Sequence, residues 1–397
     1  MAKQHLVCLL LLLMITPCLR AQKKELSQAR SYIKSGKYTD AERLMTDLLK
    51  DSANRDNKRI YLTWYDAVRG QYDAGNEKLY LKQKYDTAAF FSITQRLFTV
   101  AEKLDSVEMH PDKKGRVVLD YRNKHAAQMN AIRPNLFNGG TYHVRKGNWK
   151  DGFSFFESYL DCARQPLFVT YNYADNDQRM KEAAYWATYC GYKMNDAVLT
   201  LRYHKLALQD SARADFTLQF VAEARRLLKD EELYLKTLEE GFRRYPQFPY
   251  FFPRLMDIYT SRGQYERALA VADSALAVND SSQLYVFAKS STLLRMGRYE
   301  ESIVYSDRLL ALNDSLPEAY FNAGTAYVSM AGDLNPRKDK RRIKSCYQKA
   351  RVYLERYRAL APKEQEKWAP LLYRIYLNLN MGKQFDEIDR LLRVKSE

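Results

Sequence analysis

The sequence repeats itself with a period of about 34 residues, and this repeat restricts the possible folds more than any other feature. Two consecutive copies carry a glycine, a tyrosine and a small residue at matching positions: Gly263, Tyr265, Ala268 and then Gly297, Tyr299, Ser302. An apolar pair follows in each copy at the same offset, Ala275-Leu276 and Leu309-Leu310. A fixed period of this length is typical of repeat proteins, in which each unit buries its apolar face by stacking on its neighbours.

The repeating units are expected to be helical. The 397 residues include 15 Gly and 11 Pro, too few for the regular turns of a β-sandwich or barrel. One period before Gly263, the same frame continues through an apolar-small pair, a close-packing glycine and a proline: Val221-Ala222, Gly241-Phe242 and Pro246. The sequence therefore predicts an all-α array of helix pairs.

The repeat resembles the tetratricopeptide (TPR) family. The unit that begins near Gln247 fills family positions with Phe252, Leu255, Tyr259, Ala268, Ala275 and Leu276, although Met256 replaces the usual small residue. Weaker units show the same frame around Gly36 and Tyr38, around Gly147 and Trp149, and after Leu316. The resemblance implies a right-handed superhelical solenoid of about eight to nine helix pairs.

Two segments depart from the frame. Residues 51–132 fit it least, but apolar spacing predicts helices over Lys58–Gln71, Asp86–Leu104 and Val117–Ile132, interpreted as divergent repeats. Residues 332–342 form a basic insertion that delays a second helix until about Ile343. The whole of 22–397 is predicted to be one solenoid.

Residues 1–21 form a separate compositional unit. Lys3 precedes an apolar run from Leu6 to Ile15, and Ala21 is a small residue at the expected cleavage site. This layout predicts a secretory signal peptide, a mature chain that begins at Gln22 and a periplasmic or extracellular location. Lipidation of Cys18 is the alternative, which Pro17 disfavours because lipoprotein processing needs a small residue there.

No catalytic or cofactor motif is present, so the protein is predicted to be neither an enzyme nor a metal or cofactor binder. The sequence has no Gly-rich phosphate loop, no His-Glu-x-x-His and no paired cysteine ligand box. The cysteines Cys162, Cys190 and Cys346 are interpreted as small packing residues, and a Cys162 to Cys190 bridge is an open alternative.

TPR solenoids usually bind an extended peptide on the concave face, which the first helix of each pair lines. Transfer of those positions to the best-matched units gives Phe216, Gln219, Glu223, then Tyr250, Pro253, Asp257, then Leu284, Phe287, Ser291, then Glu318, Phe321, Thr325. The resemblance thus implies a partner groove at Tyr250, Asp257, Phe287, Ser291, Phe321 and Thr325. Packing of Phe287 and Phe321 against the adjacent helix is the alternative interpretation.

The insertion is the second candidate surface. It concentrates positive charge in a chain of formal net charge +16, through Arg337, Lys338, Lys340, Arg341, Arg342 and Lys344. Basic side chains at a helix start oppose the helix macrodipole, so helix stability does not explain them. An anionic lipid, polysaccharide or acidic protein could contact this segment. A solvated helix start without a partner is the alternative interpretation.

These features together predict an exported TPR scaffold or adaptor that mediates protein–protein interaction in the cell envelope. Export argues against a nucleic-acid partner. No transmembrane segment is expected, because the apolar run from Leu6 to Ile15 is too short to span a membrane and no comparable run follows it. A binding protein for an anionic envelope polymer or glycan is the alternative, which an exposed stacked pair of Trp or Tyr rings would favour. A catalytic solenoid with a spatially assembled site is the third.

Overall fold

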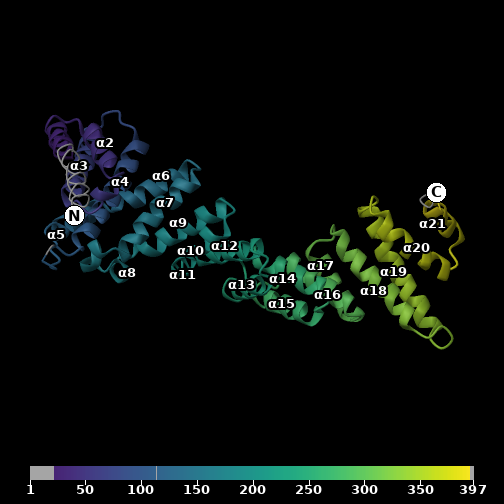
Figure 1. The fold of residues 1–397 in the computed structure, drawn as a ribbon. Coiled ribbons are helices and arrows are strands. Elements are labelled where there is room, and N and C mark those ends of the chain that lie inside the picture. Colours follow the sequence, from purple (N-terminus) through teal and green to yellow (C-terminus); the bar gives the residue numbers. More distant parts are fainter. Residues whose placement is uncertain (1–21, 113, 394–397) are drawn as a thin grey trace, which may run out of the picture. The chain divides into compact units, whose positions relative to one another are not determined.

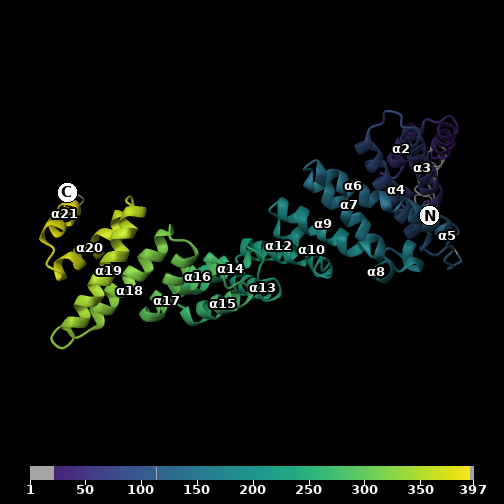
Figure 2. The ribbon, with the colours of Figure 1, turned by 180° about the vertical axis from the view of Figure 1, so that it is seen from behind.

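The computed structural model describes residues 22–112 and 114–393, and every regular element in these ranges is helical. Helix follows helix in chain order, as Figures 1 and 2 show from two sides. The predicted signal peptide lies outside the described residues. The chain divides into two compact units, one up to Asp230 and one from Glu231. Its organisation as one continuous solenoid stays a prediction.

Unit 1 begins with helical residues 22–34, followed by pairs of packed helices. Its α-helices are α2 (Tyr38–Leu48), α3 (Lys58–Tyr80), α4 (Thr87–Glu108), α5 (Arg122–Ile132), α6 (Pro134–Arg145), α7 (Trp149–Asp161), α8 (Tyr173–Asn176), α9 (Arg179–Lys193), α10 (Ala197–Arg202), α11 (His204–Ala207) and α12 (Ala214–Leu227). Short 3₁₀ turns, η1 (Ser52–Asn54), η2 (Cys162–Arg164) and η3 (Pro166–Tyr171), interrupt them. The predicted helices of the divergent segment are present, but α3 and α4 continue further than expected and α5 begins later, at Arg122.

Unit 2 is the more regular one. It contains α13 (Glu231–Arg244), α14 (Phe251–Ser261), α15 (Tyr265–Val278), α16 (Gln283–Arg295), α17 (Tyr299–Leu312), α18 (Pro317–Asp333), α19 (Lys340–Leu360), α20 (Gln365–Asn378) and α21 (Gly382–Arg393). The helices from α14 onward pack in consecutive pairs. The predicted crossing residues Ala268 and Ser302 are fully buried.

The period of the sequence is visible in the backbone of the turns within the pairs. Left-handed φ angles recur at Asn195 (56°), Lys229 (58°), Gly263 (67°) and Gly297 (75°), each one repeat period after the last. Glycine adopts this conformation without the Cβ clash that other residues meet. Since Asn195 and Lys229 adopt it without being glycine, the frame extends two units further back than the glycines alone indicate.

The pair α18–α19 is longer than its neighbours. α18 has 17 residues and α19 has 21, against 13 in α16 and 14 in α17. The basic insertion therefore extends both helices and leaves a short connection at the tip. The prediction that the second helix begins near Ile343 was wrong by three residues, because the helix already begins at Lys340.

Aromatic and small residues fill the cores, as expected for packed helix pairs. Phe98, Phe156, Phe251 and Phe252 are among the largest fully buried side chains. Cys162, Cys190 and Cys346 are buried and free, so the structure does not contain the Cys162 to Cys190 bridge.

Candidate functional site: a groove between first helices of unit 2

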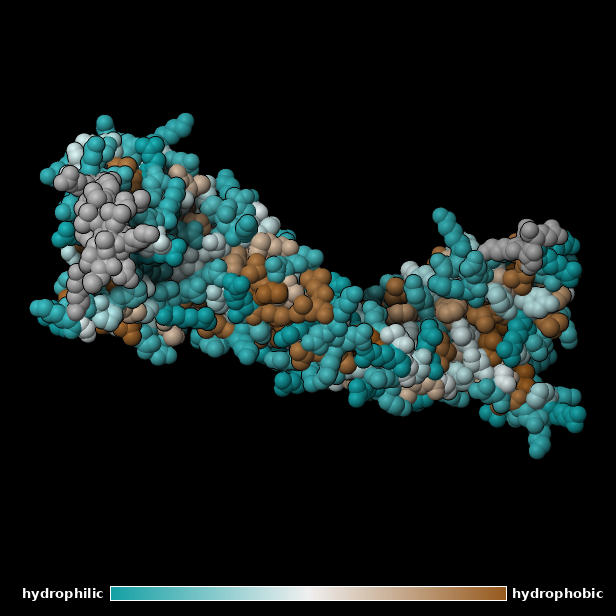
Figure 3. All heavy atoms as spheres, in the orientation of Figure 1, coloured by the Kyte–Doolittle hydropathy of each residue, from teal (hydrophilic) through white to brown (hydrophobic). Residues whose placement is uncertain are grey.

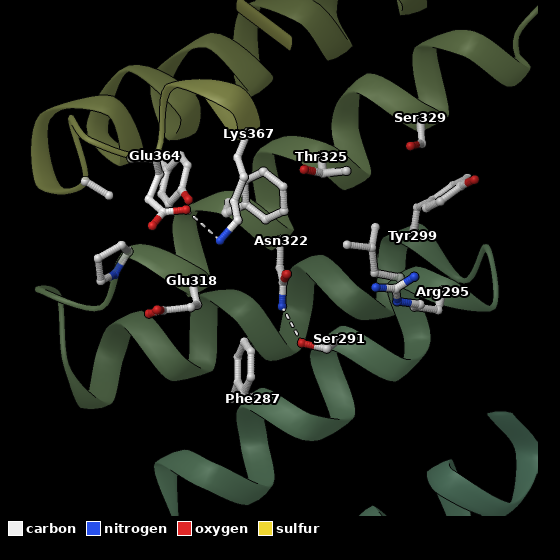
Figure 4. A pocket seen from close by; sticks show the side chains of 15 residues that line it. Phe287, Ser291, Arg295, Tyr299, Glu318, Asn322, Thr325, Ser329, Glu364 and Lys367 are labelled. Carbon is white, nitrogen blue, oxygen red and sulfur yellow. Dashed lines mark hydrogen bonds and ion pairs between the residues drawn. The ribbon is translucent and has the colours of Figure 1, made fainter. Parts of the chain in front are cut away.

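A groove of about 680 Å³ lies between the first helices of consecutive pairs in unit 2. Its walls are formed by α16 and α18, and it is closed by the end of α19 and the start of α20 (Figure 4). Apolar, hydroxyl, amide and charged side chains all line it: Phe287, Ser291, Leu294, Arg295, Tyr299, Pro317, Glu318, Phe321, Asn322, Thr325, Ser329, Tyr357, Ala361, Glu364 and Lys367.

The repeat explains why side chains of one kind face each other across this groove. Phe321 follows Phe287, and Thr325 follows Ser291, by one repeat period. Equivalent positions on two stacked first helices lie on the same face of the array. The structure accordingly brings all four predicted residues to one cavity.

The apolar part of the groove is only partly exposed. Phe287 and Phe321 are both half-buried. The ring of Phe321 packs against Tyr357 of α19, with the ring centroids 5.0 Å apart. Phe321 is therefore both a packing residue and a lining residue, so the two interpretations of this position hold together.

The floor of the groove is a polar network. Asn322 is 5% exposed, and its Nδ2 donates to the Ser291 and Ser290 hydroxyls at 2.9 and 3.2 Å. Ser290 in turn lies 2.8 Å from the Ser306 hydroxyl on α17. The Thr325 hydroxyl oxygen is buried without a hydrogen-bond partner among the described residues.

The two ends of the groove carry different charges. Arg295 is exposed and has no ion pair within the described part of the chain. At the other end, Lys367 is paired with Glu364 at 2.8 Å, and Glu318 is exposed close by (Figure 4). The groove therefore presents a cation at one end and net negative charge at the other.

Tyr250 and Asp257 lie apart from this groove. Tyr250 is buried, with the Arg254 guanidinium 3.6 Å from its ring centroid, and Asp257 is exposed on α14. Leu284 lines a smaller cavity of about 240 Å³ that shares Phe287 and Glu318 with the groove.

Four of the groove residues were not predicted from the sequence: Asn322, Arg295, Tyr357 and Lys367. A signal for Asn322 was present, because Glu318, Asn322, Thr325 and Ser329 are spaced as one face of a helix. Tyr357 and Lys367 come from beyond the insertion, where the repeat frame no longer predicts the register.

The basic insertion forms the tip of the α18–α19 hairpin. This tip protrudes at the lower right of Figure 1, and hydrophilic residues cover it in Figure 3. The Asn335 carboxamide accepts from the backbone N–H groups of Arg337 and Lys338 at 3.0 and 3.2 Å. Arg342 is paired with Asp339 at 3.5 Å. Lys340, Arg341, Arg342 and Lys344 lie in the first turns of α19.

The structure also bears on the alternative functions, a glycan-binding protein and a catalytic solenoid. No group of three or more His, Cys, Asp or Glu within the described residues could hold a metal ion. Trp149 and Trp186 both meet Tyr189 edge to face, at 5.6 and 5.7 Å. Tyr327 and Tyr353 do stack, but both rings are half-buried, so packing accounts for them. Across residues 22–112 and 114–393, no helix combines the length and apolar character that a membrane crossing needs.

No protein-family model matches the sequence, and no curated protein sequence matches it. Similar solved structures include the C-terminal part of a TPR repeat-containing protein from Cytophaga hutchinsonii, with 9% identity and a TM-score of 0.44, over 64% of this chain and 92% of that chain. A TPR repeats protein from Bacteroides fragilis has 17% identity and a TM-score of 0.32, over 65% and 98%. Yeast Tom70 has 11% identity and a TM-score of 0.34, over 94% and 91%.

The first two of these structures are named as TPR repeat proteins, and all three TM-scores lie below 0.5. The helical-repeat fold of this chain rests on its own geometry: consecutive helix pairs, a regular sequence period and left-handed turns that recur at that period.

Proposed function

We propose that this protein is a scaffold or adaptor that binds a protein partner through the groove between α16, α18 and α20. The observation that carries the proposal is the combination of apolar wall, hydrogen-bonding floor and oppositely charged ends in one cavity. Extended peptides are recognised in this way, since main-chain groups need hydrogen-bond partners and side chains need pockets. The TPR resemblance supports the same class of function.

The dimensions of the groove suit a short extended segment. Glu318 and Ser329 are eleven residues apart on α18, which corresponds to about 16 Å along a helix. About five residues of an extended chain cover that length. We propose a segment with an acidic side chain beside Arg295, an apolar side chain over Phe287 and Phe321, and a basic side chain beside Glu318.

A pentapeptide library offered to the mature protein tests this proposal. The expected result is enrichment of peptides with an acidic residue at one end, an apolar centre and a basic residue at the other. Arg295→Glu should replace the acidic preference with a basic one. Arg356→Glu is the matched control, because it makes the same charge change at an exposed residue of α19 outside the groove.

Measuring peptide binding at two salt concentrations separates the contribution of the apolar wall from that of the charged ends. Phe287→Ala should weaken binding of an enriched peptide at both about 0.1 M and about 1 M salt, because apolar burial is not screened. The Arg295 contribution should fade as the Debye length falls from about 10 Å to about 3 Å. If no peptides are enriched, or if the acidic preference persists in the Arg295→Glu variant, the groove is not the binding site.

We also propose that the protein acts after export, in the periplasm or outside the cell. Support comes from the sequence of residues 1–21, with its Lys3, apolar run and Ala21. Intact-mass analysis of the mature protein should find Gln22 as the first residue. Retention of Met1, or a diacylglycerol adduct on Cys18, would overturn this proposal.

A further inference from the structure

We infer that a second cavity in unit 2, between α18, α19 and α20, binds the phosphate group of a small organic phosphate. The cavity has a volume of about 510 Å³ and is lined by three basic residues, Lys340, Lys344 and Arg374. These three side chains are called the cation cradle below. The inference is independent of the groove, since Lys344 and the groove residue Tyr357 are thirteen residues apart on α19, about 20 Å along the helix.

Contacts to two other helices hold Arg374, on α20, in place. Its Nε donates to the Tyr347 hydroxyl of α19 at 3.0 Å, and Tyr347 is buried. Its Nη2 lies against Gly332 of α18, where the Cβ of an alanine would be only 3.0 Å away. The Nη groups have no hydrogen-bond partner among the described residues. Arg374 is exposed, and a guanidinium with unused donors is suited to bind an oxyanion through two of its N–H groups.

No carboxylate neutralises the cradle. None of the lining residues is acidic, and no ion pair of Lys340, Lys344 or Arg374 exists within the described ranges. Several other basic residues of unit 2 are paired, as in Arg298 with Glu301 and Arg358 with Glu387. The sequence from Asn335 to Leu354 contains one acid, Asp339, which is engaged by Arg342 and by the Asn335 backbone N–H at 3.1 Å.

Three exposed basic side chains therefore line one cavity in which no lining residue is acidic. Like charges repel one another, and Lys340 is in addition the first residue of α19, where the macrodipole favours anions. The two lysine side chains are exposed, so core packing gives no reason for them. An anion bound among them would remove the repulsion.

A phosphate group fits the cradle better than a carboxylate. A phosphate monoester carries about two negative charges near neutral pH, whereas a carboxylate carries one and would leave most of the positive charge unopposed. Leu334, Ile343 and Leu379 also line the cavity. Its volume lies in the range of small-molecule sites, so there is room for an apolar group attached to the phosphate.

Calorimetric titration of the mature protein with phenyl phosphate, inorganic phosphate and benzoate tests the inference. We expect saturable binding of phenyl phosphate, weaker binding of inorganic phosphate and the weakest binding of benzoate. Lys340→Gln with Lys344→Gln should weaken phosphate binding at least about tenfold, because two charge-assisted contacts are lost. Arg337→Gln with Lys338→Gln is the matched control, since it removes the same charge from the same hairpin outside the cavity.

Gly332→Ala is a second test that leaves the net charge unchanged. Alanine is favoured over glycine inside a helix, so this variant should fold, but its Cβ would displace the Arg374 guanidinium. We expect weaker phosphate binding with an unchanged or higher melting temperature. An equal loss of binding in the Lys340/Lys344 variant and in the Arg337/Lys338 control, or no saturable phosphate binding below about 10 mM, would overturn the inference.

Vesicles distinguish the source of the phosphate group. If the natural ligand is a lipid headgroup, vesicles of phosphatidic acid should bind the protein, and the Lys340 and Lys344 substitutions should abolish that binding. If the ligand is a soluble phosphate, phenyl phosphate should bind while the vesicles do not. Vesicle binding that depends equally on Arg337 and Lys338 would indicate a diffuse basic surface and contradict a cradle.

Discussion

Asn322 of α18 donates a hydrogen bond from Nδ2 to the Ser291 hydroxyl of α16 at 2.9 Å, and this bond joins the two walls of the groove at its floor. The same amide reaches Ser290, which contacts Ser306 on α17. A single side chain thus connects two consecutive repeats. Stability and partner binding are expected to depend on it together.

Asn322→Ala should lower the free energy of unfolding by about 1 to 3 kcal/mol, because buried hydroxyl groups lose their partner. Urea denaturation followed by circular dichroism measures this change. Ser329→Ala, on the same groove face, is the control and should stay within about 0.5 kcal/mol of the natural protein. Equal stability of the two variants would contradict a structural role for the network.

Thr325→Val should leave stability unchanged or raise it by up to about 1 kcal/mol. The Thr325 hydroxyl oxygen is buried without a partner among the described residues, so its removal ends a desolvation cost while the shape is kept. The same variant should bind an enriched peptide more weakly if that peptide forms a hydrogen bond with the Thr325 hydroxyl. A destabilised Thr325→Val protein would show that the hydroxyl has a partner in solution.

The left-handed turns predict opposite effects at two equivalent positions. Gly263→Ala should destabilise by about 1 to 2 kcal/mol, because φ is 67° and open space around the position leaves backbone strain as the cause. Lys229→Gly, one period earlier with φ of 58°, should stabilise by several tenths of a kcal/mol or more. Thermal denaturation of both variants checks the signs, and the same sign for both would refute the shared frame.

Glu102 of α4 is expected to make the folding stability of unit 1 depend on pH. Burial, aided by the Asp161 carboxylate, raises the pKa of Glu102 to about 7. The unfolded chain ionises near the usual pKa of about 4.3, so the folded state binds this proton more tightly. The stability that the protonated carboxyl contributes is therefore complete at low pH and is lost as the pH rises through about 7.

Glu102→Gln should accordingly stabilise the protein more at pH 8 than at pH 5, measured by urea denaturation. The difference from the natural protein is the quantity to compare, because His125 acts in the other direction. Burial lowers the pKa of His125 to about 4, and its contribution is lost as the pH falls from about 6.5 toward 4. Glu77→Gln, at an exposed position of α3, is the control and should show no such difference.

Sequence patterns alone were sufficient to predict the helical class, the period and four residues that line one groove, but not that Tyr250 and Asp257 lie apart from it. These follow from local rules: helical hydrogen bonds, turn conformations and the spacing of apolar residues act over a few residues and repeat. Phe287 with Phe321, and Ser291 with Thr325, could be paired because equal positions in equal repeats face the same way.

Tertiary packing determines which side chains meet where the repeats are unequal. The longer α18–α19 hairpin sets the register with α20, so it brings Arg374 beside Lys340 and Lys344, and Tyr357 beside Phe321. It also engages one cation of the insertion, Arg342, with Asp339 and leaves two at the cavity. The sequence could not reveal this, because an insertion shows how many residues are added but not which helix faces they bring together.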